Sequence, residues 1–226
     1  MKTIGLIGGM SWESTAEYYR IINEAVRERL GGLHSAKIVM YSVDFEEIEQ
    51  LQYEATNLMI DAAKRVERGG ADFVLICTNT MHRMAEDVAR NASIPLLHIA
   101  DATAERVVSS ELTRVGLLGT KFTMEQDFYK GRLVEKYGLE VLIPNELDRQ
   151  IVHNIIYREL CLGEIKDSSR EQLKAIIKRL GDNGAQGVIL GCTELPLLIK
   201  QGDCPIPLFD TAAIHAEAAV EYALRD

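Results

Sequence analysis

The sequence predicts an α/β protein built from two similar halves, each a doubly wound parallel sheet. Apolar segments of strand length alternate along the 226 residues with amphipathic segments of helical length. Several strand segments are apolar throughout, which is typical of parallel strands that helices cover on both faces. The second half of the chain repeats the first. We therefore expect two pseudo-symmetric subdomains with the active site in the cleft between them.

The elements follow one another in the same order in both halves. The first half has predicted strands at 3–7, 37–43 and 72–76 and helices at 14–30 and 57–69. The second half has predicted strands at 114–118, 140–143 and 187–190 and helices at 124–137, 148–160 and 169–181. The proline-marked segments 93–96 and 204–208 are each expected to lead to a short final strand and a helix. We expect the first half to comprise residues 1–97 and 209–226, and the second half residues 98–208.

The repeat pairs chemically different residues at the ends of equivalent strands. Residues 70–80 align without gaps on residues 184–194, so that Gly70 falls on Gly184 and Thr78 falls on Cys192. Two buried strands can resemble each other by accident, but the same landmarks recur here in the same order. In a pseudo-twofold arrangement, Thr78 and Cys192 are expected on opposite walls of one cleft.

Composition excludes several classes of partner. The formal net charge of -9, with no basic run, argues against nucleic acid and anionic membranes as partners. No segment is long and apolar enough to cross a bilayer, and a strand at the start leaves no room for a signal peptide. We expect a cytoplasmic protein whose four cysteines are free thiols, since their spacing matches no zinc pattern.

Cys192 is the candidate reactive group. A thiol that ends a strand and precedes a helix lies near backbone N–H groups, which lower a cysteine pKa, so Cys192 is a candidate base or nucleophile. The alternative is a buried, inert cysteine. That interpretation suits Cys77, which by strand alternation points away from the side of Thr78. Cys161 and Cys204 are expected to be structural.

The glycine turns after the first strand of each half are candidate carboxylate sites, at 8–11 and 119–123. They fit neither GxGxxG nor a P-loop, which disfavours nucleotide binding. His82 either orients a group of the site or caps and packs. No metal constellation and no lysine suited to pyridoxal phosphate stand out, so we expect no metal and no cofactor.

Three motifs together resemble the aspartate/glutamate racemase family: GLIGGMSWEST at 5–15, CTNTMH at 77–82 and GCTEL at 191–195. The resemblance covers essentially the whole chain. It implies cofactor-independent racemisation of an amino acid, in which two groups on opposite faces of the α-carbon exchange protons, and it implies a homodimer. Cys192 and Thr78 occupy the two catalytic positions. The resemblance also implies substrate-binding residues: Met10, Ser11, Gln52, Asn79, Thr80, Thr120, Thr123, Lys166 and Thr193.

The sequence departs from the family pattern at two places. Thr78 replaces the first catalytic cysteine, and the loop at 44–52 lacks the arginine that some members carry, which leaves recognition of a side-chain carboxylate to Lys166. A hydroxyl is a far weaker acid than a thiol, so it can return a proton but scarcely remove one. The resemblance assigns the second-half cysteine to the L enantiomer. We therefore predict a one-sided racemase that prefers L-aspartate or L-glutamate.

Two alternatives remain at this stage. The chain could belong to a sister group with a single thiol, such as the hydantoin racemases, arylmalonate decarboxylases or maleate isomerases. It could also be an amino-acid-binding protein that kept the fold and lost one base.

Overall fold

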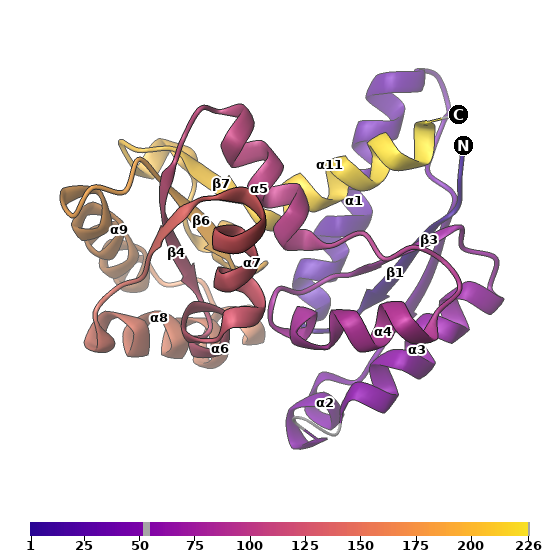
Figure 1. Ribbon diagram of the computed structural model, residues 1–226, viewed down its shortest axis with the longest axis horizontal. Coiled ribbons are helices and arrows are strands. Elements are labelled where there is room, and N and C mark those ends of the chain that lie inside the picture. Colours follow the sequence, from indigo (N-terminus) through magenta and orange to yellow (C-terminus); the bar gives the residue numbers. More distant parts are fainter. Residues whose placement is uncertain (52–54, 226) are drawn as a thin grey trace. The chain divides into compact units, whose positions relative to one another are not determined.

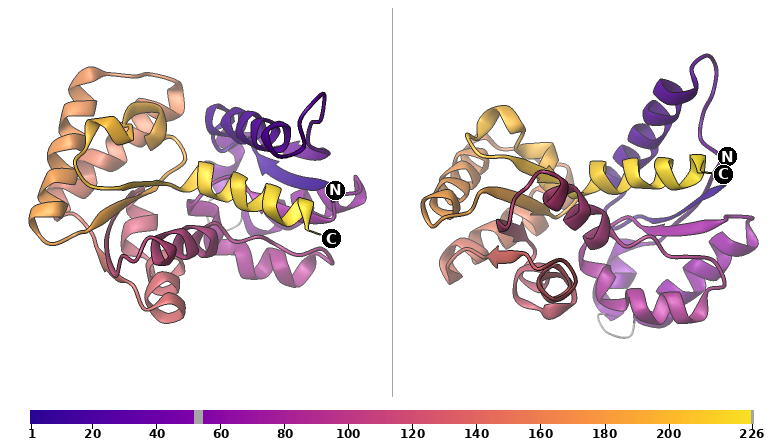
Figure 2. Two further views of the ribbon diagram at one scale, coloured as in Figure 1. Left: turned by 90° about the horizontal axis from the view of Figure 1, so that it is seen from above. Right: turned by 45° about the horizontal axis from the view of Figure 1, so that its top comes forward.

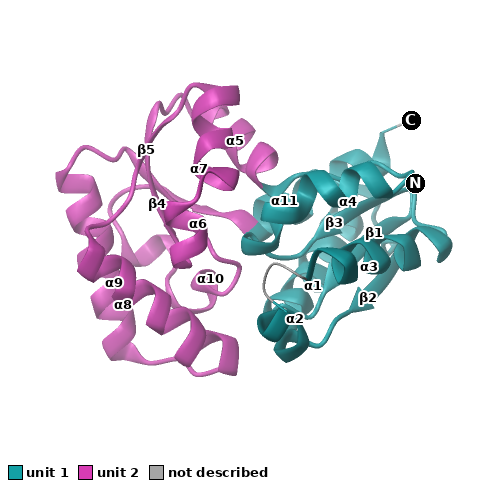
Figure 3. Ribbon diagram, turned by 60° about the horizontal axis from the view of Figure 1, so that its bottom comes forward, with its two compact units in different colours: residues 1–99, 212–226 teal, residues 100–211 magenta. Residues whose placement is uncertain are grey.

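The computed structural model describes residues 1–51 and 55–225, which form two compact units (Figure 3). Unit 1 comprises residues 1–99 and 212–226, and unit 2 comprises residues 100–211. Each unit has its own parallel sheet, which confirms the predicted α/β class with two parallel-sheet subdomains. In the described ranges no helix has the length and apolar character that a membrane span requires.

The sheet of unit 1 has three parallel strands in the order β2-β1-β3. The strands are β1 (Ile4–Gly8), β2 (Ile38–Ser42) and β3 (Phe73–Ile76). The central strand β1 is buried along its whole length, as its sequence IGLIG predicts. Gly5 is required there, because a Cβ atom at this position would lie 2.3 Å from Cγ1 of Val66.

Helices cover both faces of this sheet (Figure 1). They are α1 (Trp12–Leu30), α2 (Phe45–Leu51), α3 (Thr56–Arg68), the short 3-10 helix η2 (Thr80–Met84), α4 (Ala85–Asn91) and α11 (Thr211–Leu224). One core contains Ile7, Val74 and Ile76 with side chains of α3 and α4. The other contains Leu6, Phe73 and Leu75 with side chains of α1 and α11. Unit 1 is therefore doubly wound.

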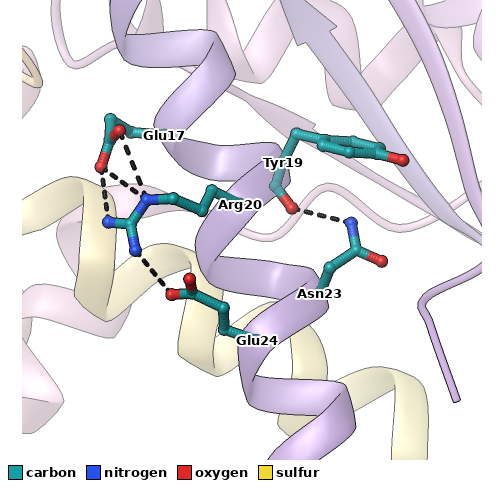
Figure 4. Close-up of polar contacts among 5 residues, drawn as sticks. All are labelled: Glu17, Tyr19, Arg20, Asn23 and Glu24. Carbon is teal, nitrogen blue, oxygen red and sulfur yellow. Dashed lines mark hydrogen bonds and ion pairs between the residues drawn. The ribbon is translucent and has the colours of Figure 1, made fainter. Parts of the chain in front are cut away.

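Helix α1 separates a buried stripe from a charged face. Tyr18, Ile22 and Val26 are fully buried. On the exposed face, the Arg20 guanidinium contacts the carboxylates of Glu17 and Glu24, each at 2.6 Å (Figure 4). Such solvated pairs contribute at most about 1 kcal/mol each. The stability of the helix in the unit therefore comes from its buried stripe.

The sheet of unit 2 has four parallel strands in the order β5-β4-β6-β7. The strands are β4 (Arg114–Gly119), β5 (Glu140–Leu142), β6 (Gly187–Gly191) and β7 (Leu208–Asp210). The helical elements are α5 (Ile99–Ser109), α6 (Lys121–Glu125), α7 (Asp127–Tyr137), α8 (Glu146–Arg158), η3 (Leu160–Leu162), α9 (Asp167–Asp182), α10 (Leu195–Leu198) and η4 (Gln201–Asp203).

The internal repeat is visible in the backbone. Gly70 and Gly184 both have left-handed φ angles, of 92° and 98°. Their N–H groups donate to Glu67 and Gly181, each at 2.9 Å, so both close the end of a helix before a strand. The proline segments also match: Val74 N donates to Pro95 O at 2.9 Å, and Val188 N donates to Pro207 O at 2.8 Å.

Three predicted elements differ. The loop predicted at 44–52 contains helix α2 (Phe45–Leu51). The helix predicted at 124–137 is divided into α6 and α7, because Gln126 is extended (φ -88°, ψ 154°) and serves as the N-cap of α7. The strand predicted after segment 93–96 is a single bridge between Val74 and Leu96 in the described residues, whereas the equivalent segment of unit 2 leads into β7.

The two ends of the described chain lie side by side in unit 1 (Figure 2). The N–H of Lys2 donates to the carbonyl of Ala223 at 2.8 Å. Helix α11 thus completes the unit that begins with β1.

Candidate active site

In unit 1 the candidate residues lie at the carboxyl ends of two adjacent strands. Met10 and Ser11 follow β1, and Thr78, Asn79 and Thr80 follow β3. All five are buried. The ladder between the two strands continues to Cys77, whose N–H donates to Ile7 O at 2.9 Å. One sheet edge therefore positions both turns, as the carboxyl ends of parallel strands do in open α/β sheets.

The turn after β1 is fixed by Thr15 of helix α1. Its hydroxyl oxygen accepts from Gly9 N at 2.9 Å, and the hydroxyl donates to Ser11 O at 2.8 Å. This approach requires glycine at position 8, because a Cβ atom there would lie 2.3 Å from Cγ2 of Thr15. The glycine turn thus places Met10 and Ser11 against the N-terminus of α1.

The turn after β3 is held by His82. Its backbone N–H donates to Asn79 O at 3.1 Å, and its Nδ1 lies 2.7 Å from Thr78 O. The imidazole is buried, with only 3 % of the residue exposed. The imidazole thus contacts the backbone of a predicted site residue.

In unit 2 the turn after β4 begins with a capped helix. Thr120 is the N-cap of α6, and its hydroxyl oxygen accepts from Thr123 N at 3.3 Å. The two hydroxyl oxygens lie 3.2 Å apart, and both residues are buried. Gly119 lies against the neighbouring strand, since a Cβ atom there would be 2.7 Å from Gly191 O. The turn after β4 is thereby placed beside Cys192.

Cys192 follows β6 and contacts a carboxylate. Its thiol donates to Oε2 of Glu194 at 2.9 Å, and the Thr193 hydroxyl donates to the same oxygen at 3.1 Å. The residues Cys192, Thr193 and Glu194 are 6 %, 3 % and 3 % exposed. A buried thiol thus shares a hydrogen bond with a buried carboxylate.

The expected low thiol pKa is wrong. Burial raises the pKa of Cys192 well above its usual value, and the negative charge of Glu194 raises it further, with a smaller contribution from Cys161. The helix that follows, α10, has only four residues, so its dipole is weak. Cys192 is therefore protonated at neutral pH until a base takes its proton, and the base in contact with it is Glu194.

Sequence reasoning missed Glu194. It stands inside the motif GCTEL, but its residue type alone did not distinguish it from the many other carboxylates of the chain. The available signal was its place two residues after the candidate thiol, at a strand end where side chains are buried.

Lys166 lies at the N-cap of α9 and is about half exposed. Its ammonium group contacts Glu164 at 2.7 Å and Glu159 at 3.6 Å. The hydrogen bond to Glu164 and the charge of Glu159 raise its pKa, so it stays cationic. A substrate carboxylate would compete with these partners. The predicted position Gln52 lies outside the described residues.

Of the remaining cysteines, Cys161 lies close enough to Cys192 to contribute to the raised pKa of that thiol. Cys77 is fully buried in the core beneath α1 and α11, and burial raises its pKa. Cys204 is buried before Pro205, and Cys161 is partly buried in η3. Within the described ranges, no group of three or more His, Cys, Asp or Glu side chains is arranged to hold a metal ion.

Comparison with known proteins identifies relatives of this chain. The family model described as Asp/Glu/hydantoin racemase matches residues 7–219. The broad specificity amino-acid racemase RacX of Bacillus subtilis (strain 168) is 24% identical over 96% of this chain and 96% of its own length. A candidate Asp/Glu racemase from Yersinia pestis is 54% identical with a TM-score of 0.92, and both chains are covered completely. An aspartate racemase homologue from Pyrococcus horikoshii OT3 is 40% identical with a TM-score of 0.87, again over both complete chains.

The two parallel-sheet units and these relatives define an isomerase of the racemase class. Within that class, the chain belongs to the Asp/Glu/hydantoin racemase family.

Proposed function

We propose that this enzyme racemises aspartate or glutamate, with preference for the L enantiomer, by proton transfer at one carbon and without a cofactor. Cys192 takes the α-proton, and Thr78 is the group proposed to act on the opposite face of the α-carbon. The observation that carries the proposal is the buried Cys192–Glu194 pair at 2.9 Å, at the repeat position where unit 1 has a buried hydroxyl.

The proton balance starts from a neutral thiol and a Glu194 carboxylate. The thiol proton passes to Oε2 of Glu194 while Sγ takes the α-proton of the L substrate, so Cys192 remains a thiol and Glu194 becomes neutral. The carbanion is reprotonated on the other face by the Thr78 hydroxyl, or by a water that it binds. After product release, solvent takes the proton from Glu194 and restores the one lost at Thr78.

Buried donors would stabilise the charge that develops on the substrate carboxylate. Preorganised hydrogen-bond donors of this kind are usually the largest single contribution to such a reaction. The candidates are the hydroxyls, amides and N–H groups at the four strand ends, from Met10, Ser11, Asn79, Thr80, Thr120, Thr123 and Thr193. Lys166 would bind the side-chain carboxylate of the substrate.

The asymmetry follows from acidity. A thiol has a pKa near 8.5 in water, whereas an aliphatic hydroxyl ionises only far above the neutral range, so Thr78 is a poor base. Abstraction from the D enantiomer is therefore expected to be slow. Because a catalyst leaves the equilibrium unchanged, the difference must appear in kinetic parameters for the two directions.

The decisive experiment is α-deuterium exchange in D2O with each enantiomer of aspartate and glutamate, followed by NMR and chiral chromatography. We expect faster exchange from the L side, and loss of exchange by at least about a thousandfold in Cys192→Ala, as when a reacting group is removed. Cys204→Ser is the matched control and should retain activity. Equal exchange from both enantiomers would contradict the asymmetry, and an active Cys192→Ala would contradict the proposal. Binding without exchange would instead indicate an amino-acid-binding protein.

The proposal includes a cytoplasmic homodimer, by resemblance to the family. Light scattering coupled to size-exclusion chromatography measures the mass directly. A monomeric mass, near the 25.2 kDa of the chain, would contradict the dimer.

A further inference from the structure

His82 fixes two consecutive peptide groups after β3. Its ring Nδ1 contacts Thr78 O at 2.7 Å, and its backbone N–H contacts Asn79 O at 3.1 Å. These are the carbonyls of the two residues whose side chains the proposed reaction places against the substrate. The ring of one buried histidine therefore contacts the backbone that presents Thr78.

The hydrogen-bond partners define the tautomer of His82. A carbonyl oxygen can only accept, so Nδ1 must carry a hydrogen to bond Thr78 O. The N–H of Ile99 donates to Nε2 at 3.2 Å, so Nε2 must be an unprotonated acceptor. The ring is thus a neutral Nδ1–H imidazole, with a separate function for each nitrogen.

Strand pairing does not hold Thr78. The last ladder bond between β3 and β1 is that of Cys77 N to Ile7 O, and residues 77–79 form a bend. The Thr78 carbonyl accepts from the His82 ring, whereas the Asn79 carbonyl accepts from the backbone N–H of residue 82, as in any 3-10 turn. Proton transfer requires reacting groups placed within about 0.5 Å, so a hydroxyl on such a bend needs a support of this kind.

The imidazole is itself held by its surroundings. The His98 ring packs edge-on at 4.5 Å between centroids, and the His215 ring lies at 5.9 Å. His215 is anchored in turn, with Nε2 2.9 Å from Leu97 O and Nδ1 2.9 Å from the Tyr18 hydroxyl. The ring of His82 therefore has little room to turn, and the Ile99 bond fixes which nitrogen faces Thr78.

We propose that His82 is a positioning residue that controls the stereochemical outcome of the reaction by holding Thr78 through its carbonyl. With Thr78 in place, the carbanion is protonated on the Thr78 face and the product is inverted. With Thr78 displaced, the proton returns from Cys192, and the substrate exchanges its α-hydrogen without inversion. This inference rests on the proposed racemase function. It adds a residue that determines whether the substrate is inverted or keeps its configuration.

Two variants separate the functions of the ring nitrogens. In His82→Asn the side-chain amide can occupy the place of Nδ1 and donate to Thr78 O, but it cannot reach Ile99. In His82→Gln the amide oxygen can occupy the place of Nε2 and accept from Ile99 N, but the bond to Thr78 O is lost. Thr78→Ala is a reference variant that shows the ratio of inverted to retained product when the hydroxyl is absent.

The measurement is the ratio of D product to α-deuterated L substrate, starting from L-aspartate in D2O. We expect His82→Gln to lower this ratio by about fivefold or more, the effect of one lost hydrogen bond, and His82→Asn to stay within about twofold of the wild type. A merely structural histidine would lower thermal stability and both rates together, and leave the ratio unchanged. If His82→Asn and His82→Gln give equal ratios while Thr78→Ala lowers the ratio, the inference about His82 is overturned. The proposed function then still stands.

Two further results keep the tests separate. If Thr78→Ala leaves the ratio unchanged, or if Cys192→Ala still exchanges, the proposed function fails before His82 is tested. If His82→Gln does not fold, the 15N chemical shifts of the wild-type imidazole decide, because the inference requires the Nδ1–H tautomer. An Nε2–H tautomer would overturn it.

Discussion

The Sγ atom of Cys192 lies 2.9 Å from Oε2 of Glu194, and both side chains are buried at the end of β6. Burial and the neighbouring charge raise the thiol pKa, which keeps the proton on sulfur in the free enzyme. The same carboxylate is the acceptor that can take this proton when the substrate arrives. One contact therefore has opposite effects on spontaneous ionisation and on catalysis.

Glu194→Gln should separate these effects. Removal of the charge lowers the pKa of the Cys192 thiol, so alkylation of the free enzyme by iodoacetamide should become faster at a fixed pH. Racemisation should fall by about a hundredfold, the usual contribution of a proton acceptor. It should also rise with pH in the variant, since the thiol must then lose its proton to solvent.

Glu194→Asp is the control, because it keeps a carboxylate near the sulfur. It should recover part of the racemisation and keep alkylation slow. If alkylation and racemisation change in the same direction in Glu194→Gln, Glu194 is not the proton acceptor.

Thr78→Cys should make the enzyme more symmetric. A thiol at this strand end can ionise in a range where a hydroxyl cannot, so α-deuterium exchange from D-aspartate should rise by about tenfold or more. Thr78→Ser keeps the hydroxyl and should leave the D side slow. A D-side rate in Thr78→Cys no higher than in Thr78→Ser would contradict the assignment of Thr78.

Because His215 is buried, the free energy of unfolding should fall in mild acid. Burial lowers the pKa of this histidine to about 4, against an ordinary value of 6.5. The unfolded chain therefore binds the proton more readily than the folded protein. The stabilisation from neutral His215 is complete above pH 6.5 and is lost as the pH falls towards 4. The loss amounts to about 3 kcal/mol of the free energy of unfolding.

Urea denaturation at several pH values measures this dependence. His215→Gln should show a flatter stability curve over that pH range, whatever its stability at neutral pH. His34→Gln is the control, since His34 is exposed, and it should keep the wild-type slope. An unchanged slope in His215→Gln would show that other groups cause the acid sensitivity.

Gly119→Ala should destabilise unit 2 and displace the thiol. The added Cβ would meet the Gly191 carbonyl oxygen at 2.7 Å and Cβ of Thr123 at 3.1 Å, so backbone must shift. Overpacking of this kind costs about 1–3 kcal/mol. Gly202→Ala is the matched control, because its Cβ would meet no atom within 4 Å. Equal denaturation midpoints for the two variants would contradict the close approach of β4 and β6.

Much of the fold could be predicted from the sequence because several strands are apolar throughout and helices separate them. The predicted strand at 187–190 lies within β6 (Gly187–Gly191), and the predicted helix at 57–69 matches α3 (Thr56–Arg68) to one residue at each end. The division at Gln126 could not be predicted, because it depends on one residue that adopts an extended conformation between two short helices.

The site was less predictable than the fold. Strand alternation separated Cys77, which is in the core, from the strand-end position Thr78. The thiol pKa was predicted in the wrong direction, because burial and a carboxylate two residues away outweigh a four-residue helix. The contacts of His82 depend on Ile99, seventeen residues further along the chain, and local sequence patterns do not reveal such a contact.

Helix α11 belongs to unit 1, but the ribosome synthesises it after unit 2. It supplies Ala216, Ala219 and Val220 to the core that contains Leu6, Phe73 and Cys77. The three strands of this unit leave the ribosome well over a hundred residues before the helix that covers one of their faces. Since domains generally fold as units during synthesis, unit 2 can complete its sheet while unit 1 still exposes an apolar surface. The order of folding is therefore expected to run against the order of synthesis.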